Sequence, residues 1–181
     1  MAFTGPNALW VRALARAGAA LERPDWVARA ERGINAILDQ MAAGDLLHRT
    51  RSADQVWTSG LLEDLVQSAR ACIAVAQAAD RGELVDEARR LADSMRRHLW
   101  DENGGFVDHV AGEDSVGALA YSDRPFPANA DAALLLLALD GLDAGPGRHV
   151  AGEVLALLEP VAARYGQDAA PFALAVSRLH G

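Results

Sequence analysis

The sequence has few of the residues that build disulfides, metal centres and cofactor sites. It contains one cysteine, Cys72, so no internal disulfide can form and nothing points to secretion. Its five histidines show no metal-ligand spacing, and no phosphate-binding loop or dinucleotide fingerprint occurs. We therefore expect no metal and no cofactor. Cys72 falls at an apolar helical position, where we expect a buried, inert thiol.

Long apolar runs and an excess of positive charge are missing as well. The longest apolar run, residues 132–139, is far too short to span a bilayer and predicts a helix that is buried on all sides. The first residues lack the charged and then apolar pattern of a signal peptide, so we expect a cytoplasmic protein. The formal net charge of -8 argues against nucleic-acid and membrane partners.

What the sequence does have is alanine-rich helical periodicity. Its 181 residues suffice for a single domain, 1–181, with a substantial core. Apolar residues recur three and four positions apart, which predicts an all-α protein of about seven helices. The helices are expected at about 7–22, from Pro24 until Gly44, from about 60 to 76 after the caps Thr58 and Ser59, at 83–100, at 129–140, within 148–165, and after the cap Asp168.

Details of these segments carry further expectations. In the first helix we expect Leu9, Trp10, Leu14 and Ala17 to point inward. Residues 46–56 read as irregular. The segment 101–127 has no helical period and is longer than an ordinary connection, which is typical of functional or mobile loops. Within it, residues 104–110 are expected to form one arm of a small hairpin.

One stretch of the chain occurs twice. Residues 23–32 reappear with the same chemistry as residues 81–90, which is 58 positions later. A helical pattern precedes each copy and another follows it. A repeat of two helices is typical of helical-hairpin arrays, which bury their core by stacking hairpins and can enclose a central funnel. The six main helices pair as three hairpins.

Three motif-like segments resemble a known family. They are Phe-Thr-Gly-Pro-Asn-Ala-Leu at 3–9, Gly-Leu-Leu-Glu-Asp-Leu at 60–65 and Pro-Phe-Pro-Ala-Asn-Ala at 125–130. They resemble the Trp-Asn-Gly-Leu, Leu-Glu-Asp-Tyr and Pro-Ser-Gly-Asn motifs of thioredoxin-domain proteins of the YyaL and spermatogenesis-associated type. Residues 47–50 and 100–106 also look like that family. The likeness covers nearly the whole chain and matches the C-terminal half of such proteins.

The resemblance implies a half or partial (α/α)6 toroid, similar to N-acylglucosamine 2-epimerases and six-hairpin glycosidases, and hence a sugar-processing scaffold. The chain departs from the motifs at Pro6, at Leu65 and in the residues before Asn129, and it lacks a Cys-x-x-Cys pair. Two hypotheses therefore stay open. The chain is an enzyme for a small polar substrate, a carbohydrate in the first place, or a non-catalytic helical module for assembly or ligand binding.

The candidate catalytic residues are Glu63 and Asp64, in the first turn of the third helix. Either they complement the helix dipole or one of them faces the funnel as a general acid or base. Adjacent helical residues point about 100° apart, so both cannot face it equally. Glycoside chemistry needs an opposing carboxylate, which would come from Asp108, Asp123 or Asp131.

The candidate ligand-binding residues lie at helix starts and in the long loop. Asn7 and Asn129 either cap their helices or line a pocket where alternate helix starts gather. The segment 120–127 is either a surface loop or a lid or ligand-binding loop, and Arg124 would suit a carboxylate or phosphate. Trp57 is a candidate stacking platform for a sugar. The full set is Asn7, Trp57, Tyr121, Asp123, Arg124 and Asn129.

The hairpin count also predicts an assembly. Three hairpins are half of a six-hairpin ring, and a half-ring leaves apolar helix edges uncovered. We therefore expect a homodimer, which could close a toroid by two-fold symmetry. The alternative is that the seventh helix folds back over the open edge.

Overall fold

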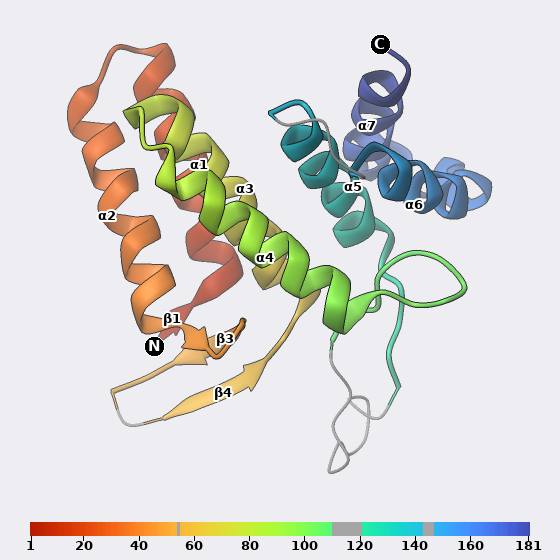
Figure 1. The fold of residues 1–181 in the computed structure, drawn as a ribbon, viewed down its shortest axis with the longest axis horizontal. Coiled ribbons are helices and arrows are strands. Elements are labelled where there is room, and N and C mark those ends of the chain that lie inside the picture. The colour runs from red at the N-terminus through yellow and green to blue at the C-terminus, as the bar shows by residue number, and fades with distance from the viewer. Residues whose placement is uncertain (54, 110–120, 143–146) are drawn as a thin grey trace. The chain divides into compact units, whose positions relative to one another are not determined.

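The computed structural model describes residues 1–181 except 54, 110–120 and 143–146 (Figure 1). The chain is mostly helical and adds a small antiparallel sheet, so the predicted helical class is confirmed in its coarse form. It divides into two compact units, Met1–Ser94 and Met95–Gly181. A single domain over 1–181 stays a prediction.

The first unit contains three complete helices and most of a fourth. They are α1 (Thr4–Ala20), α2 (Pro24–Gln40), α3 (Leu62–Ala79) and α4 (Glu83–Leu99), of which the last five residues belong to the second unit. Helix α1 packs against both α2 and α3. Glycines allow this close approach, because a Cβ on Gly18 would lie 2.9 Å from Val27 Cγ2 and one on Gly33 2.7 Å from Val11 Cγ2.

The buried face of α1 differs from the predicted one. Small residues are buried, while Trp10 is 70% and Leu9 37% exposed, so their predicted inward orientation is wrong. Leu14 and Ala17 are only partly buried. A helix that contacts two neighbours at short distance favours small residues in its contact face, so the large side chains lie outside. The buried residues are Thr4, Gly5, Ala8, Val11, Ala15 and Gly18.

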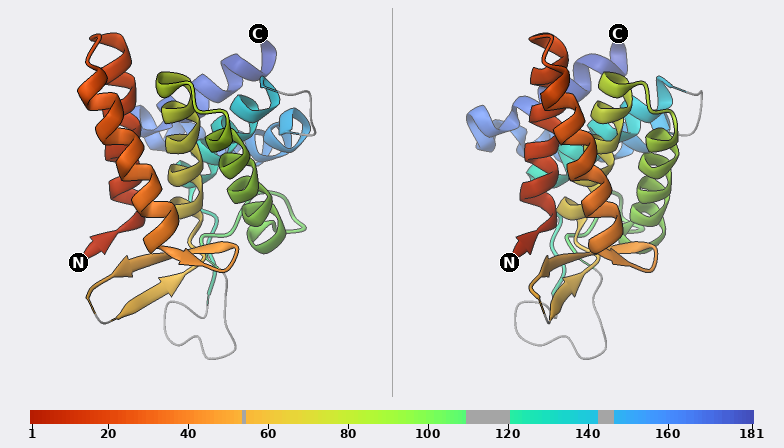
Figure 2. Two further views of the ribbon diagram at one scale, coloured as in Figure 1. Left: turned by 60° about the vertical axis from the view of Figure 1, so that its left-hand side comes forward. Right: turned by 90° about the vertical axis from the view of Figure 1, so that its left-hand side faces the viewer.

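The segment 46–56, which the sequence predicts to be irregular, contains the central strand of a small sheet. The strands of this sheet are β1 (Ala2–Phe3), β2 (Ala42–Ala43), β3 (Leu46–Arg51) and β4 (Val56–Ser59). Strand β3 pairs antiparallel with each of the other three. Figure 2 shows the sheet at the end of the helices where α1 begins and α2 ends. Thr58 and Ser59 belong to β4, so they do not cap α3, whose N-cap is Leu61.

The two copies of the repeat occupy equivalent places in the fold. Residues 23–32 contain the start of α2, and residues 81–90 contain the start of α4. The copies also touch, because Arg81 Nε donates a hydrogen bond to Glu31 Oε1 at 2.7 Å. Helix α3 precedes the second copy and is buried over most of its length. It carries Cys72, which is fully buried as predicted, and burial raises the pKa of this thiol to about 12.

The second unit consists of the last five residues of α4, a loop and further helices. They are α5 (Phe126–Asp140), α6 (Gly147–Ala162), the 3-10 helix η2 (Ala163–Ala169) and α7 (Ala170–His180). Helix α5 packs on α6 and α7, and residues 132–137 are buried on every face, as predicted. The ring of Phe126 stacks on Tyr165 with centroids 4.0 Å apart. Asp168 lies within η2 and makes no cap, since the N-cap of α7 is Ala169.

In the part of the chain that the structure describes, no helix is both long enough and apolar enough to cross a membrane.

Candidate functional site

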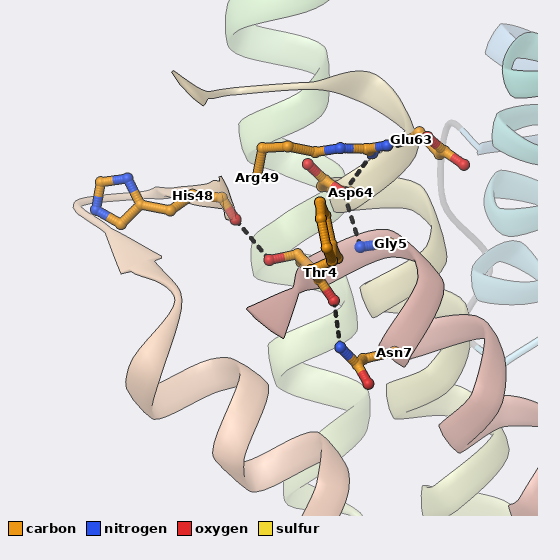
Figure 3. Close-up of polar contacts among 8 residues, drawn as sticks. Thr4, Gly5, Asn7, His48, Arg49, Glu63 and Asp64 are labelled. Carbon is orange, nitrogen blue, oxygen red and sulfur yellow. Dashed lines mark hydrogen bonds and ion pairs between the residues drawn. The ribbon is translucent and has the colours of Figure 1, made fainter. Parts of the chain in front are cut away.

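Charged side chains gather where α1, α3 and β3 meet (Figure 3). The backbone N–H of Gly5 donates to Asp64 Oδ1 at 2.7 Å, and Arg49 Nη1 lies 3.0 Å from the same oxygen. Arg49 Nη1 also donates to Glu63 Oε2 at 2.8 Å. The Arg49 guanidinium therefore bridges two adjacent carboxylates. We call Arg49, Glu63 and Asp64 the arginine–carboxylate cluster.

The local fold explains how the two neighbouring acids differ. Both are in the first turn of α3, where their negative charge complements the helix dipole. Because consecutive helical residues point in different directions, Asp64 is completely buried whereas the Glu63 side chain is 47% exposed. Gly5 must lack a side chain, since a Cβ there would lie 2.8 Å from Asp64 Oδ1.

Burial dominates the electrostatics of Asp64. Loss of solvation raises the pKa of this carboxyl from 3.8 to about 6, although the Arg49 charge and the Gly5 N–H favour the ionised form. The charge of Glu63 adds to the increase. Asp64 Oδ2 is buried and has no hydrogen-bond partner among the described residues. The protonation of Asp64 therefore changes around pH 6, where an ordinary aspartate stays ionised.

Two further hydrogen bonds fix the start of α1. Thr4 Oγ1 donates to the carbonyl oxygen of His48 on β3 at 2.5 Å, and Asn7 Nδ2 donates to the Phe3 carbonyl oxygen at 2.6 Å. Asn7 lies inside α1, so the prediction that it caps the helix is wrong. The helix begins earlier because Pro6 is accommodated in the first turn, where its missing N–H costs nothing.

Asn7 lines a groove between α1 and α2. The groove has a volume of about 360 Å³ and is lined by Asn7, Trp10, Val11, Leu14, Arg29 and Gly33. No member of the arginine–carboxylate cluster lines it. The helical pattern predicts Trp10 on the buried face of α1, so the sequence does not predict this groove. A large aromatic residue on the outer face of a helix is the feature that marks it.

In the second unit, Asn129 connects α5 to the preceding loop. Its Oδ1 accepts a hydrogen bond from Phe106 N–H at 2.7 Å, and its Nδ2 donates to the Phe106 carbonyl oxygen at 2.8 Å and to that of Pro125 at 3.1 Å. The side chain is completely buried. Asn129 lies inside α5, whose N-cap is Pro125, so the predicted cap is wrong. Its amide holds the loop backbone at Phe106.

The predicted lid residues are tied to the same loop. The Asp108 N–H donates a hydrogen bond to the Asp123 carbonyl oxygen at 2.8 Å, and the Asp123 N–H donates to Asp108 Oδ1 at 2.9 Å. Asp108 Oδ1 also lies 2.8 Å from His109 Nδ1. Arg124 forms an ion pair with Asp101 at 2.5 Å. The adjoining part of the lid segment, at Ala120, and the end of the expected hairpin arm, at Val110, lie outside the described residues.

The remaining candidates are exposed aromatics. Trp57 on β4 is 39% and Tyr121 is 81% exposed. Asn7, Trp57, Glu63 and Asp64 belong to the first unit, and Tyr121, Asp123, Arg124 and Asn129 to the second. Their convergence on one pocket stays a prediction. Over the described ranges, no three His, Cys, Asp or Glu side chains are grouped so that they could hold a metal ion.

No protein-family model matches the sequence, and no curated protein is similar enough to match it.

Proposed function

We propose that this chain binds a small polar ligand, a carbohydrate in the first place, on a half or partial (α/α)6 toroid of the kind found in YyaL-type thioredoxin-domain proteins. Consecutive helical hairpins support this architecture, since α1 packs against α2 and the repeated segment opens both α2 and α4. The ligand-contacting groups are those of the arginine–carboxylate cluster that reach solvent.

One observation carries the proposal. A partly exposed guanidinium is held between an exposed carboxylate and a buried one whose pKa is raised to about 6. A carboxyl with a shifted pKa beside a fixed cation is typical of functional sites. Arg49 donates hydrogen bonds and Glu63 accepts them, which is the pairing that vicinal sugar hydroxyls require. Asp64 is fully buried, so it positions Arg49 and does not touch the ligand.

The second candidate is a non-catalytic assembly module. The burial of Asp64 favours it, because the carboxylate ties α1 to α3 and is closed to any substrate. In this case the chain forms a homodimer that covers the helix edges left open by a half-ring. Light scattering after size exclusion should then give twice the chain mass of 19.2 kDa. A monomer at micromolar concentration would remove the dimer proposal.

Ligand binding is tested with thermal shift assays on a panel of neutral sugars and sugar phosphates. A binding sugar raises the melting temperature of the wild type, and Glu63→Gln should abolish this increase. The matched control is Glu83→Gln, which changes an exposed acid in the first turn of α4. If both acids only complement helix dipoles, each variant loses about 0.3–1 kcal/mol of stability and no sugar stabilises the wild type. An undiminished sugar effect in Glu63→Gln would refute the assignment.

A further inference from the structure

The groove between α1 and α2 has a definite composition. Gly33 and Val11 both line it, and the helices are so close there that a Cβ on Gly33 would lie only 2.7 Å from Val11 Cγ2. Trp10 and Leu14 add apolar walls, and Asn7 and Arg29 are its only polar lining residues. Its volume of about 360 Å³ is in the range of small-molecule sites.

The polar groups that line this groove are only partly used within the described part of the protein. Arg29 is exposed and has no ion pair in the described ranges, although the chain holds 25 acidic against 17 basic residues. Arg23 and Arg81, by contrast, pair with Asp25 and Glu31. Asn7 commits its Nδ2 to the Phe3 carbonyl oxygen, and its Oδ1 has no partner among the described residues. The groove thus offers a ligand one cation, the Arg29 guanidinium, and one hydrogen-bond acceptor, Asn7 Oδ1.

The Trp10 ring supplies the third element. It is 70% exposed, far more than is usual for an indole, and it lines the groove beside Leu14. An exposed indole binds a flat ring by stacking, and a guanidinium binds a carboxylate through two parallel hydrogen bonds. With two polar lining residues the groove cannot satisfy the many hydroxyl groups of a sugar, so an apolar ring fits it better.

We propose that this groove binds a small aromatic carboxylate. The ring stacks on Trp10, the carboxylate pairs with Arg29, and a ring hydroxyl donates to Asn7 Oδ1. The site is separate from the arginine–carboxylate cluster, none of whose residues lines the groove. If no sugar binds at the arginine–carboxylate cluster, the proposal for the groove is not affected. If no aromatic carboxylate binds in the groove, the sugar proposal is not affected.

The test is a titration with 4-hydroxybenzoate, followed by the NMR signal of the Trp10 indole N–H. That signal is identified by its loss in Trp10→Phe. We expect it to shift saturably with 4-hydroxybenzoate and to shift weakly with the neutral 4-hydroxybenzamide. An unmoved Trp10 signal at about 10 mM ligand, tenfold above the Kd of a millimolar site, would overturn the proposal. Equal binding of glucuronate would overturn the preference for an aromatic ring.

Variants separate the two recognition elements. Arg29→Gln should weaken 4-hydroxybenzoate binding about tenfold or more, since a charge-assisted pair is lost, while the exposed neighbour Arg32→Gln on α2 should not. Trp10→Ala should weaken binding about 2–10-fold, and Leu9→Ala, which lies outside the groove, should leave it unchanged. These side chains are exposed, so the variants keep their circular dichroism. Equal binding by Arg29→Gln and the wild type would overturn the carboxylate assignment.

Discussion

The carboxylate of Asp64 accepts a hydrogen bond from the backbone N–H of Gly5, 59 residues earlier in the chain, at 2.7 Å. Arg49 reaches the same oxygen from β3 at 3.0 Å. One buried oxygen therefore joins the start of α1, the start of α3 and the middle of the sheet. Because this oxygen links three elements of the first unit, changes at Asp64 should be measurable as changes in the stability of that unit.

The pH dependence of that stability follows from the raised pKa of Asp64. The folded state binds the proton more tightly than the unfolded chain, so stability from this group is present below about pH 4 and is lost as the pH rises through about 6. Two pKa units correspond to on the order of 2–3 kcal/mol. Urea unfolding from pH 4.5 to 7.5 should show this decrease in the wild type relative to Asp64→Asn. The exposed control Asp39→Asn should follow the wild type, and parallel curves for wild type and Asp64→Asn would contradict the prediction.

Asn129→Ala should destabilise the second unit strongly. It leaves the Phe106 N–H and two carbonyl oxygens without their buried partner, at a cost of about 2–4 kcal/mol. Asn129→Asp should not restore the stability, because a carboxylate oxygen would then face the carbonyl oxygens of Phe106 and Pro125. Urea unfolding measures both effects. The exposed control Asn35→Ala should stay within about 0.5 kcal/mol of the wild type.

The Asp101 carboxyl should titrate far below the ordinary range. Its hydrogen bonds with Arg124 and with the Asn103 N–H lower its pKa to about 2. The stabilisation it provides is present above the ordinary pKa of an aspartate and is lost as the pH falls through about 2. A carboxyl carbon NMR titration should find this midpoint in the wild type and in the control Arg178→Gln, and a higher one in Arg124→Gln. An identical midpoint in all three proteins would show that the ion pair does not form in solution.

Two neighbouring glycines should respond unequally to alanine. Gly104 and Gly105 both have a positive φ, +88° and +78°, so alanine is strained at each by about 1–2 kcal/mol. A Cβ on Gly104 meets nothing within 4 Å, whereas one on Gly105 would lie 2.6 Å from Leu157 Cδ2. Gly105→Ala should therefore cost about 1–3 kcal/mol more than Gly104→Ala in urea unfolding. Adding Leu157→Ala should remove most of the difference, and equal costs for the two glycines would show that Leu157 does not pack there.

Local sequence signals predicted which segments are helical better than they predicted the residue at which each helix begins. Pro24 followed by Asp25 identified the start of α2 correctly, because proline suits the first turn and an acid complements the dipole. Pro6 and Pro127 also lie in the first turns of α1 and α5, without an acid, and from the sequence alone we expect the asparagines after them to be helix caps. A helix starts before such a proline, so Asn7 and Asn129 are internal.

The site was predictable only in part. Glu63 and Asp64 stood out as acids in a first helical turn, and the structure separates them into an exposed and a buried side chain. Arg49 was not among the candidates, because its role depends on β3, which pairs with the distant strand β1 and lacks alternating hydrophobicity. The outward Trp10 was missed for a similar reason, since packing against both α2 and α3 decides which face of α1 is buried.

Strand β3 pairs with three strands: β1 at the start of the chain, β2 just before β3 and β4 just after it. Its six residues thus have their alignment fixed by three independent ladders. A slip by one residue would break all of them at once and turn the buried Leu47 toward solvent. Arg49 lies two positions along the same strand, so the same three ladders fix the position from which its guanidinium reaches Asp64 Oδ1 at 3.0 Å.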